Sequence, residues 1–293
     1  MITELEFKSL TAQGYNRIPL IAQAFADLET PLSLYLKLAC TDDDGRPSQA
    51  HRRHSFLLES VVGGERFGRY SFIGLPASTV LRNFGRRTEI VKNGAVIETH
   101  EGNPLEFIEQ YQARFKVALR PGLPRFCGGL AGYFGYDTVR HIEKKLVHSC
   151  PPDDLGMPDI LLLQTEELAV IDNLSGKLSL IVYADPAQTD AYAKAHARLA
   201  ELKQRLKAPA QAPSIAPCAS HPAERSFAKD DYLAAVLRAK DLIAAGDFMQ
   251  VQVGQRIHKK FTASPLSLYR ALRSLNPSPY MYYYNLGDAY VVG

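Results

Sequence analysis

Two segments in the first two thirds of the chain show the apolar alternation of paired β-strands. In "TEIVKNGAVIET", Thr88 to Thr99, apolar residues alternate on both sides of Asn93-Gly94. A two-residue hairpin turn requires positive φ at both positions, which Asn and Gly adopt readily, so this run predicts a β-hairpin. The segment from Glu167 to Asp185 predicts a second hairpin. Strands joined by hairpins form antiparallel sheets, so we expect mainly antiparallel pairing.

Helices are predicted where apolar residues recur every three or four positions. Asn103 is followed at once by Pro104, and three residues after Asn103 comes Glu106, which together indicate a helix start. The apolar face of this helix consists of Leu105, Ile108, Tyr111 and Phe115. A second stripe from Tyr192 to Leu206 predicts another helix. Helices packed on antiparallel sheets make an α+β fold.

The C-terminal part contains five further predicted elements. A helix is expected to start with Asp230 or Asp231 as its cap and to end at Gly246. The run "FMQVQVGQRIHKKF", residues 248–261, alternates as a strand does. Next come a short helix over "SPLSLYRALRSL" and two strands within "YMYYYNLGDAYVVG".

A Pro- and Ala-rich segment, residues 206–225, separates these two parts. It holds four prolines and six alanines and shows almost no apolar periodicity, so we interpret it as a surface linker. The linker divides the chain into a region 1–205 and the start of a second domain, 226–293. Because few residues follow the linker, we expect that domain to be incomplete and the fold to be truncated before its completion.

Composition narrows the class of protein. Of the 293 residues, 46% are hydrophobic and 22% charged, which is typical of a soluble globular chain. The absence of a long apolar run or a signal peptide favours the cytoplasm and argues against a membrane. The net charge of +3 makes nucleic acid a poor partner. Four widely spaced cysteines, Cys40, Cys127, Cys150 and Cys218, are interpreted as reduced structural thiols.

Standard catalytic motifs are absent, and three stretches remain as candidates. In the first, "SFLLESVVGGERFGRYSFIG", Glu59 and Ser60 end an apolar strand and could receive an ammonium group. The simpler interpretation is an ordinary strand end, with Glu59 paired to Arg66 or Arg69. In the second, "FCGGLAGYFGYDTVRHIE", four glycines allow close backbone approach, most simply where sheet packs on sheet.

The third stretch is "NPSPYMYYY", Asn276 to Tyr284. Pro277 and Pro279 fix their own φ and hold the residues before them extended, which makes a rigid bend whose carbonyls could face a ligand. Met281 and the tyrosines offer flat, polarizable surfaces to an aromatic molecule. A rigid entry into a core strand explains the same residues equally well.

As a set, "LLES" (Leu57 to Ser60), "GGLAGYFGYD", "MPDILL", "GDFMQVQVGQRI" and "NPSPYMYYY" resemble the large subunit of anthranilate synthase, the component I family of chorismate-utilising enzymes. The resemblance runs almost from end to end. It implies a lyase of tryptophan biosynthesis with an antiparallel β-sandwich core flanked by helices, which converts chorismate and ammonia to anthranilate and pyruvate. It also implies Mg²⁺ and a glutamine amidotransferase subunit as partner. The region 1–205 then corresponds to the family's N-terminal region, and 226–293 to the start of its chorismate-binding domain.

The resemblance places the family's catalytic and metal-binding residues downstream of Gly293, so no catalytic or metal-ligating residue is assigned within this chain. It does imply a feedback site for L-tryptophan, in a pocket between the sheets. By residue match, the site consists of Glu59, Ser60, Asn276, Pro279, Tyr280 and Met281. Arg69 is a weaker candidate for the ligand carboxylate. These residues also suit the ligand's ammonium and indole groups.

Two other functions remain open from the sequence. The chain could be a non-catalytic module that binds tryptophan. It could also be a fragment of a related enzyme such as aminodeoxychorismate synthase, although "NPSPYM" beside "LLES" favours anthranilate synthase.

Overall fold

The computed structural model describes the chain except residues 1, 41–53, 62–67, 151, 212 and 214–218. The chain forms two compact units. The first consists of residues 1–212 together with 269–293, and the second of residues 213–268. The last strands of the chain therefore pack with its N-terminal part. The assignment of 226–293 to one incomplete domain stays a prediction.

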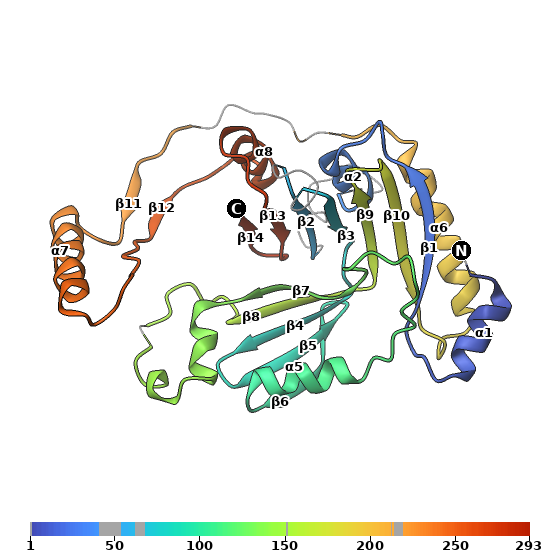
Figure 1. Ribbon diagram of the computed structural model, residues 1–293, viewed down its shortest axis with the longest axis horizontal. Coiled ribbons are helices and arrows are strands. Elements are labelled where there is room, and N and C mark those ends of the chain that lie inside the picture. Colours follow the sequence, from blue (N-terminus) through green and yellow to red (C-terminus); the bar gives the residue numbers. More distant parts are fainter. Residues whose placement is uncertain (1, 41–53, 62–67, 151, 212, 214–218) are drawn as a thin grey trace. The chain divides into compact units, whose positions relative to one another are not determined.

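The larger sheet of the first unit has seven antiparallel strands in the order β1-β10-β9-β3-β2-β13-β14 (Figure 1). Their bounds are β1 Ile18–Phe25, β2 Ser55–Glu59, β3 Tyr70–Gly74, β9 Glu167–Asp172, β10 Lys177–Ala184, β13 Met281–Asn285 and β14 Tyr290–Val292. In this order β13, from the end of the chain, lies directly beside β2.

The second sheet has five antiparallel strands in the order β6-β5-β4-β8-β7. Their bounds are β4 Thr79–Phe84, β5 Arg87–Lys92, β6 Ala95–Glu101, β7 Gly129–Phe134 and β8 Ile160–Thr165. Apolar side chains of both sheets meet in one buried cluster, which includes Phe56, Val80, Leu163, Val170 and Ile181. The two sheets therefore pack face to face and enclose the core between them, as in a β-sandwich.

Helices cover the outer faces of both sheets (Figure 1). On the five-stranded sheet, α5 (Pro104–Ala113) buries Phe107, Ile108 and Tyr111 against strand residues such as Ile90. On the seven-stranded sheet lie α2 (Pro31–Leu38) and α6 (Ala191–Leu206). Further short helices in the described part of this unit include α1 Glu4–Ala12, η1 Tyr136–His141 and η2 Lys144–Leu146. The predicted α+β class, with an antiparallel sandwich flanked by helices, is confirmed.

Local sequence signals correctly predicted the two hairpins and the start of α5. β5 and β6 form the first hairpin, with Asn93 at φ 52° and Gly94 at φ 83° in the turn. β9 and β10 form the second hairpin. The side chain of Asn103 caps α5 by accepting a hydrogen bond from the backbone N–H of Leu105 at 3.0 Å. None of the three described cysteines, Cys40, Cys127 and Cys150, is in a disulfide bond, while Cys218 lies outside the described residues.

The second unit differs from the sequence-based expectation in two places. Its elements are β11 Ala223–Arg225, α7 Lys229–Ala245 and β12 Ile257–Lys259, and it contains the first residues of α8 Pro265–Leu275. The predicted cap of α7 was wrong, because Ala228 occupies the N-cap and both aspartates lie in the first turn, where the helix dipole favours them. The predicted end at Gly246 is confirmed.

The strand predicted over residues 248–261 was also mostly wrong. Only Ile257–Lys259 is a strand, paired with β11. An alternating pattern forms a stable strand where one face is covered, and the side chain of Met249 is 95% exposed. The described part of the chain supplies no strand beside residues 248–256. Within the same described part, no helix is both long and apolar enough to cross a membrane.

The glycine-rich stretch packs closely in two different ways. A Cβ at Gly128 would lie 2.5 Å from the ring of Tyr183, which belongs to the other sheet. A Cβ at Gly132 would lie 2.0 Å from the carbonyl oxygen of Leu161, on the neighbouring strand of the same sheet. The predicted close packing is thus found both between the sheets and within one of them.

Candidate functional site at the junction of β2 and β13

The two sequence segments singled out as a ligand site meet at one end of the seven-stranded sheet. In the antiparallel pairing of β2 with β13, Glu59 lies opposite Met281. Just beyond this pair, the backbone N–H of Val61 donates to the carbonyl oxygen of Ser278 at 3.2 Å. Segments more than two hundred residues apart therefore converge. We call this place the β2–β13 corner, made of residues 59–61 and 276–281.

The six predicted residues occupy different positions at the corner. Glu59 is the last residue of β2 and Met281 the first of β13, and both are buried, whereas Tyr280 is 71% exposed. Ser60 and Pro279 are half-buried, and Asn276 is exposed at the end of α8. The backbone N–H of Tyr280 donates to the Ser278 hydroxyl at 3.2 Å, which fixes the bend between the prolines and the strand.

Side-chain alternation decides which face of the sheet these residues occupy. Phe56 and Tyr284 face the other sheet, because both pack in the core between the sheets. Glu59 and Met281 lie on the opposite face, where Glu59 contacts α8. The two residues therefore face the covering helices and not the space between the sheets, where the sequence-based expectation put the pocket.

The Glu59 carboxylate is buried and accepts three hydrogen bonds. Its Oε1 accepts from Nη2 of Arg273 at 2.7 Å, and its Oε2 accepts from Nε of Arg273 at 2.7 Å. Oε2 also accepts from the hydroxyl of Tyr269 at 2.9 Å. A planar guanidinium that binds both oxygens forms one of the stronger hydrogen-bonded ion pairs in proteins. We call these three side chains the Glu59 clamp.

Within the Glu59 clamp, the pKa values of Arg273 and Tyr269 are both shifted. The hydrogen bonds that the Arg273 guanidinium donates to Glu59 raise the pKa of Arg273, so it stays charged. Burial, with the nearby Glu59 carboxylate as a second cause, raises the pKa of Tyr269, so its hydroxyl stays protonated and can donate. A charged donor and a neutral donor thus meet one buried carboxylate.

Sequence reasoning missed Arg273 and Tyr269. Both lie on α8, four residues apart and hence on one helix face, directly before the Pro-rich bend. That spacing was visible in the sequence. Their partner was not, because it lies 214 residues away from Arg273.

The alternative pairing of Glu59 with Arg69 was wrong. The Arg69 guanidinium binds Asp172, with Nη2 to Oδ2 at 2.9 Å, and this pair lowers the pKa of the Asp172 carboxyl. The other suggested partner, Arg66, lies outside the described residues. Arg69 is therefore already committed to a carboxylate on β9, which weakens it as a receptor for a ligand carboxylate.

A cluster of tyrosine rings packs next to the β2–β13 corner. The ring of Tyr283, next on the same face of β13, packs edge-on against Tyr269 of α8 at 5.9 Å and against Tyr35 of α2 at 5.6 Å. The hydroxyl of Tyr35 shares a 2.9 Å hydrogen bond with that of Ser55. Buried rings with satisfied hydroxyls hold α2 and α8 on the sheet and so fix the position of Glu59.

The geometry defines an α+β protein with two facing antiparallel sheets and a buried carboxylate held at one sheet end. Residues 60–293 match the family model described as chorismate binding enzyme. The chain therefore belongs to the chorismate-binding enzyme family.

Relatives with curated names agree with the resemblance drawn from the motifs. The chain is 51% identical over its whole length to "Anthranilate synthase component 1" of Neisseria meningitidis serogroup B and 50% identical over 98% of its length to that of Pseudomonas aeruginosa. It spans 58% of the length of each of these relatives. The crystal structure of anthranilate synthase component I from Streptococcus pneumoniae shares the fold, with a TM-score of 0.63 at 24% identity over 92% of this chain and 56% of that one.

Proposed function

We propose that this chain is part of the large subunit of an anthranilate synthase, which converts chorismate and ammonia to anthranilate and pyruvate. The observation that carries the proposal is the 51% identity to a component 1 across the entire chain. We further propose that a glutamine amidotransferase subunit supplies the ammonia and that the enzyme works in the cytoplasm.

The elimination needs charge neutralisation and a proton donor, and Mg²⁺ is the proposed source of the first. Within the described residues, no group of three or more His, Cys, Asp or Glu side chains could hold a metal ion. The described part of the chain therefore does not fit the ion, and none of its residues is assigned a step through Mg²⁺.

We also propose that the β2–β13 corner takes part in feedback inhibition by L-tryptophan. The convergence of the two segments supports this, because it puts a carboxylate, backbone carbonyls and an exposed ring within one small region. The ammonium group would bind at Glu59, with Ser60 and Asn276 as further polar contacts. The indole would contact Tyr280 and Met281, with Pro279 fixing the bend.

The clamp adds a physical condition to this proposal. Because Arg273 and Tyr269 already occupy both Glu59 oxygens, an incoming ammonium group has to share the carboxylate with them or displace one of them. A carboxylate offers about four acceptor positions, so sharing is chemically feasible. Tryptophan binding and the position of α8 would then be coupled.

Calorimetry with L-tryptophan tests the regulatory site directly. We expect this chain to bind it with a dissociation constant on the order of micromolar and to bind L-phenylalanine far more weakly, because the smaller ring lacks the indole N–H. Ser60→Phe and Tyr280→Ala are expected to weaken binding at least about tenfold. The matched control is Tyr136→Ala, which removes a ring that is 92% exposed elsewhere. Equal affinity in all three variants would contradict the assignment.

A chimera tests the enzymatic part. This chain is fused to the remaining segment of the Neisseria meningitidis relative, and anthranilate fluorescence is followed with chorismate, MgCl₂ and ammonium. We expect anthranilate to form and L-tryptophan to inhibit its formation. A folded chimera that binds chorismate but releases a different aromatic product would favour a related activity, such as that of aminodeoxychorismate synthase.

A second candidate function is a tryptophan-binding module without catalysis. It is favoured by one observation, that both halves of the proposed regulatory site lie within this chain. Tryptophan binding by the chain together with an inactive, folded chimera would support it over the enzyme.

A further inference from the structure

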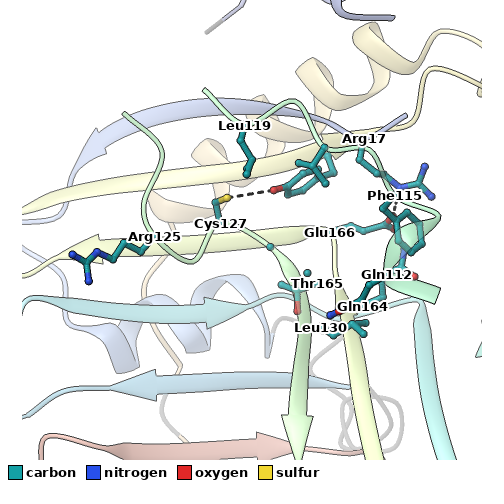
Figure 2. A pocket seen from close by; sticks show the side chains of 14 residues that line it. Arg17, Gln112, Phe115, Leu119, Arg125, Cys127, Leu130, Gln164, Thr165 and Glu166 are labelled. Carbon is teal, nitrogen blue, oxygen red and sulfur yellow. Dashed lines mark hydrogen bonds and ion pairs between the residues drawn. The ribbon is translucent and has the colours of Figure 1, made fainter. Parts of the chain in front are cut away.

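A cavity of about 310 Å³ lies in the first unit (Figure 2). It is formed by residues 112–130, the connection between β8 and β9, the residue before β1, and β10. Its lining consists of Arg17, Gln112, Phe115, Val117, Leu119, Arg125, Cys127, Gly128, Gly129, Leu130, Gln164, Thr165, Glu166 and Tyr183. None of these belongs to the proposed tryptophan site, so the cavity requires an explanation of its own.

The walls are mainly apolar. Phe115, Leu119 and Leu130 contribute apolar side chains, and Figure 2 shows Leu119 turned toward the thiol of Cys127. Gly128 keeps the space open on the β10 side, since a Cβ there would collide with the Tyr183 ring at 2.5 Å. A cavity of this size with apolar walls fits one small ring system.

The charges of Arg17 and Glu166 at the cavity are paired within the protein. Arg125 also lines the cavity, but Figure 2 shows its side chain turned away from the other lining side chains. The Arg17 guanidinium contacts Glu166 at 3.1 Å and Asp185 at 3.1 Å, and it lies 4.8 Å from the centre of the Phe115 ring. Glu166 additionally accepts from the amide nitrogen of Gln164 at 2.8 Å. A charged ligand beside Arg17 would have to break this network, whereas an uncharged ligand leaves it intact.

One polar group of the lining has only a weak partner. The Tyr183 hydroxyl donates to the Cys127 sulfur at 3.5 Å, and sulfur is a poor acceptor. Burial raises the pKa of Tyr183, with the hydrogen bond to Cys127 as a second cause, so the phenol keeps its proton. An oxygen atom of a ligand would be a better acceptor for this O–H.

We propose that this cavity binds a small, uncharged molecule with one flat ring and a carbonyl oxygen. The ring packs against Phe115, Leu119 and Leu130, and the carbonyl oxygen accepts a hydrogen bond from Tyr183. The site is independent of the proposed enzymatic function and of the tryptophan site.

Benzamide and benzoate are suitable probes because they have nearly the same shape and differ in charge. Titrated into the full chain by calorimetry, benzamide is expected to bind with a dissociation constant on the order of a millimolar, which is ordinary for so small a molecule. Benzoate is expected to bind at least about tenfold more weakly. Equal or tighter binding of benzoate would overturn the proposal, as would the lack of saturable benzamide binding.

The proposed hydrogen bond from the Tyr183 hydroxyl to the ligand is tested with Tyr183→Phe, which removes the hydroxyl and keeps the ring. Loss of one hydrogen bond is expected to weaken benzamide binding about fivefold. The matched control is Tyr136→Phe, which removes an exposed hydroxyl outside the cavity and should leave the affinity unchanged. Unchanged affinity in Tyr183→Phe would refute the assigned donor.

Alkylation of the cysteines locates the bound probe without any substitution. Cys127 is buried in the cavity wall and Cys150 is exposed elsewhere, so peptide mass spectrometry after iodoacetamide treatment reports both thiols in one sample. Saturating benzamide is expected to slow modification of Cys127 several-fold and to leave Cys150 unaffected. If Cys127 reacts at the same rate with and without bound benzamide, the probe binds elsewhere and the proposal fails.

Discussion

Replacing Arg273 with methionine is expected to lower the free energy of unfolding of the first unit by about 3 kcal/mol. The substitution keeps an apolar stem of similar length and removes the guanidinium that binds both oxygens of Glu59. The carboxylate would then stay buried, at 4% residue exposure, with the Tyr269 hydroxyl as its remaining partner in the clamp. A buried charge without its counterion is among the costliest defects in a protein. Urea titration followed by far-ultraviolet circular dichroism measures the change.

The same helix offers a matched control. Arg270 makes no ion pair with any residue that the structure describes, so Arg270→Met is expected to change the free energy of unfolding by less than about 0.5 kcal/mol. A double variant, Glu59→Leu with Arg273→Met, should be more stable than Arg273→Met alone, because it contains no isolated buried carboxylate. Equal losses in Arg273→Met and Arg270→Met would show that the clamp does not stabilise the corner.

Replacing Gly132 with alanine is expected to destabilise the first unit by roughly 3 kcal/mol. Three backbone atoms surround the added Cβ: the carbonyl oxygen of Leu161 at 2.0 Å, the carbonyl carbon of Leu161 at 2.9 Å and the Cα of Leu162 at 3.0 Å. Backbone in a strand ladder cannot rotate away as a flexible side chain can. The pairing of β7 with β8 would have to open at its centre, and β8 carries core residues such as Leu163.

Gly254→Ala is the control for the glycine substitution. An added Cβ at Gly254 meets no atom within 4 Å, and its φ lies outside the left-handed region, so we expect a change of less than about 0.5 kcal/mol. Both variants are compared by urea titration, and soluble yield gives a second measure. A Gly132→Ala protein as stable as the parent would mean that β7 can shift without cost.

Much of the architecture could be predicted because its causes are local. The Asn93-Gly94 turn needs two residues that accept positive φ, and both are adjacent in the chain. The start of α5 depends on Asn103 and the residue two positions later. Prediction was less successful for elements that need a partner from a distant part of the sequence. The alternating run 248–261 has the pattern of a strand, yet pattern alone cannot supply the paired strand or the covered face that it needs.

The motifs allowed the family to be inferred from the sequence, since "LLES", the glycine-rich stretch and "NPSPYMYYY" occur together in order. The sequence also pointed to two distant segments as one site, and the β2–β13 pairing brings them together. Their role in binding tryptophan stays a prediction.

By itself, then, the sequence determined the fold class, the main hairpins and helices, and the family, because turn chemistry, capping and periodicity act over a few residues. Only the tertiary structure decided that Glu59 is held by Arg273 and Tyr269, that it faces the helices, and that Arg69 is bound to Asp172. The choice among several nearby arginines depends on which face each strand turns toward its neighbours. That face is set by the pairing register of strands such as β2 and β13, which lie more than two hundred residues apart in the sequence. A pattern within a few residues does not contain this register.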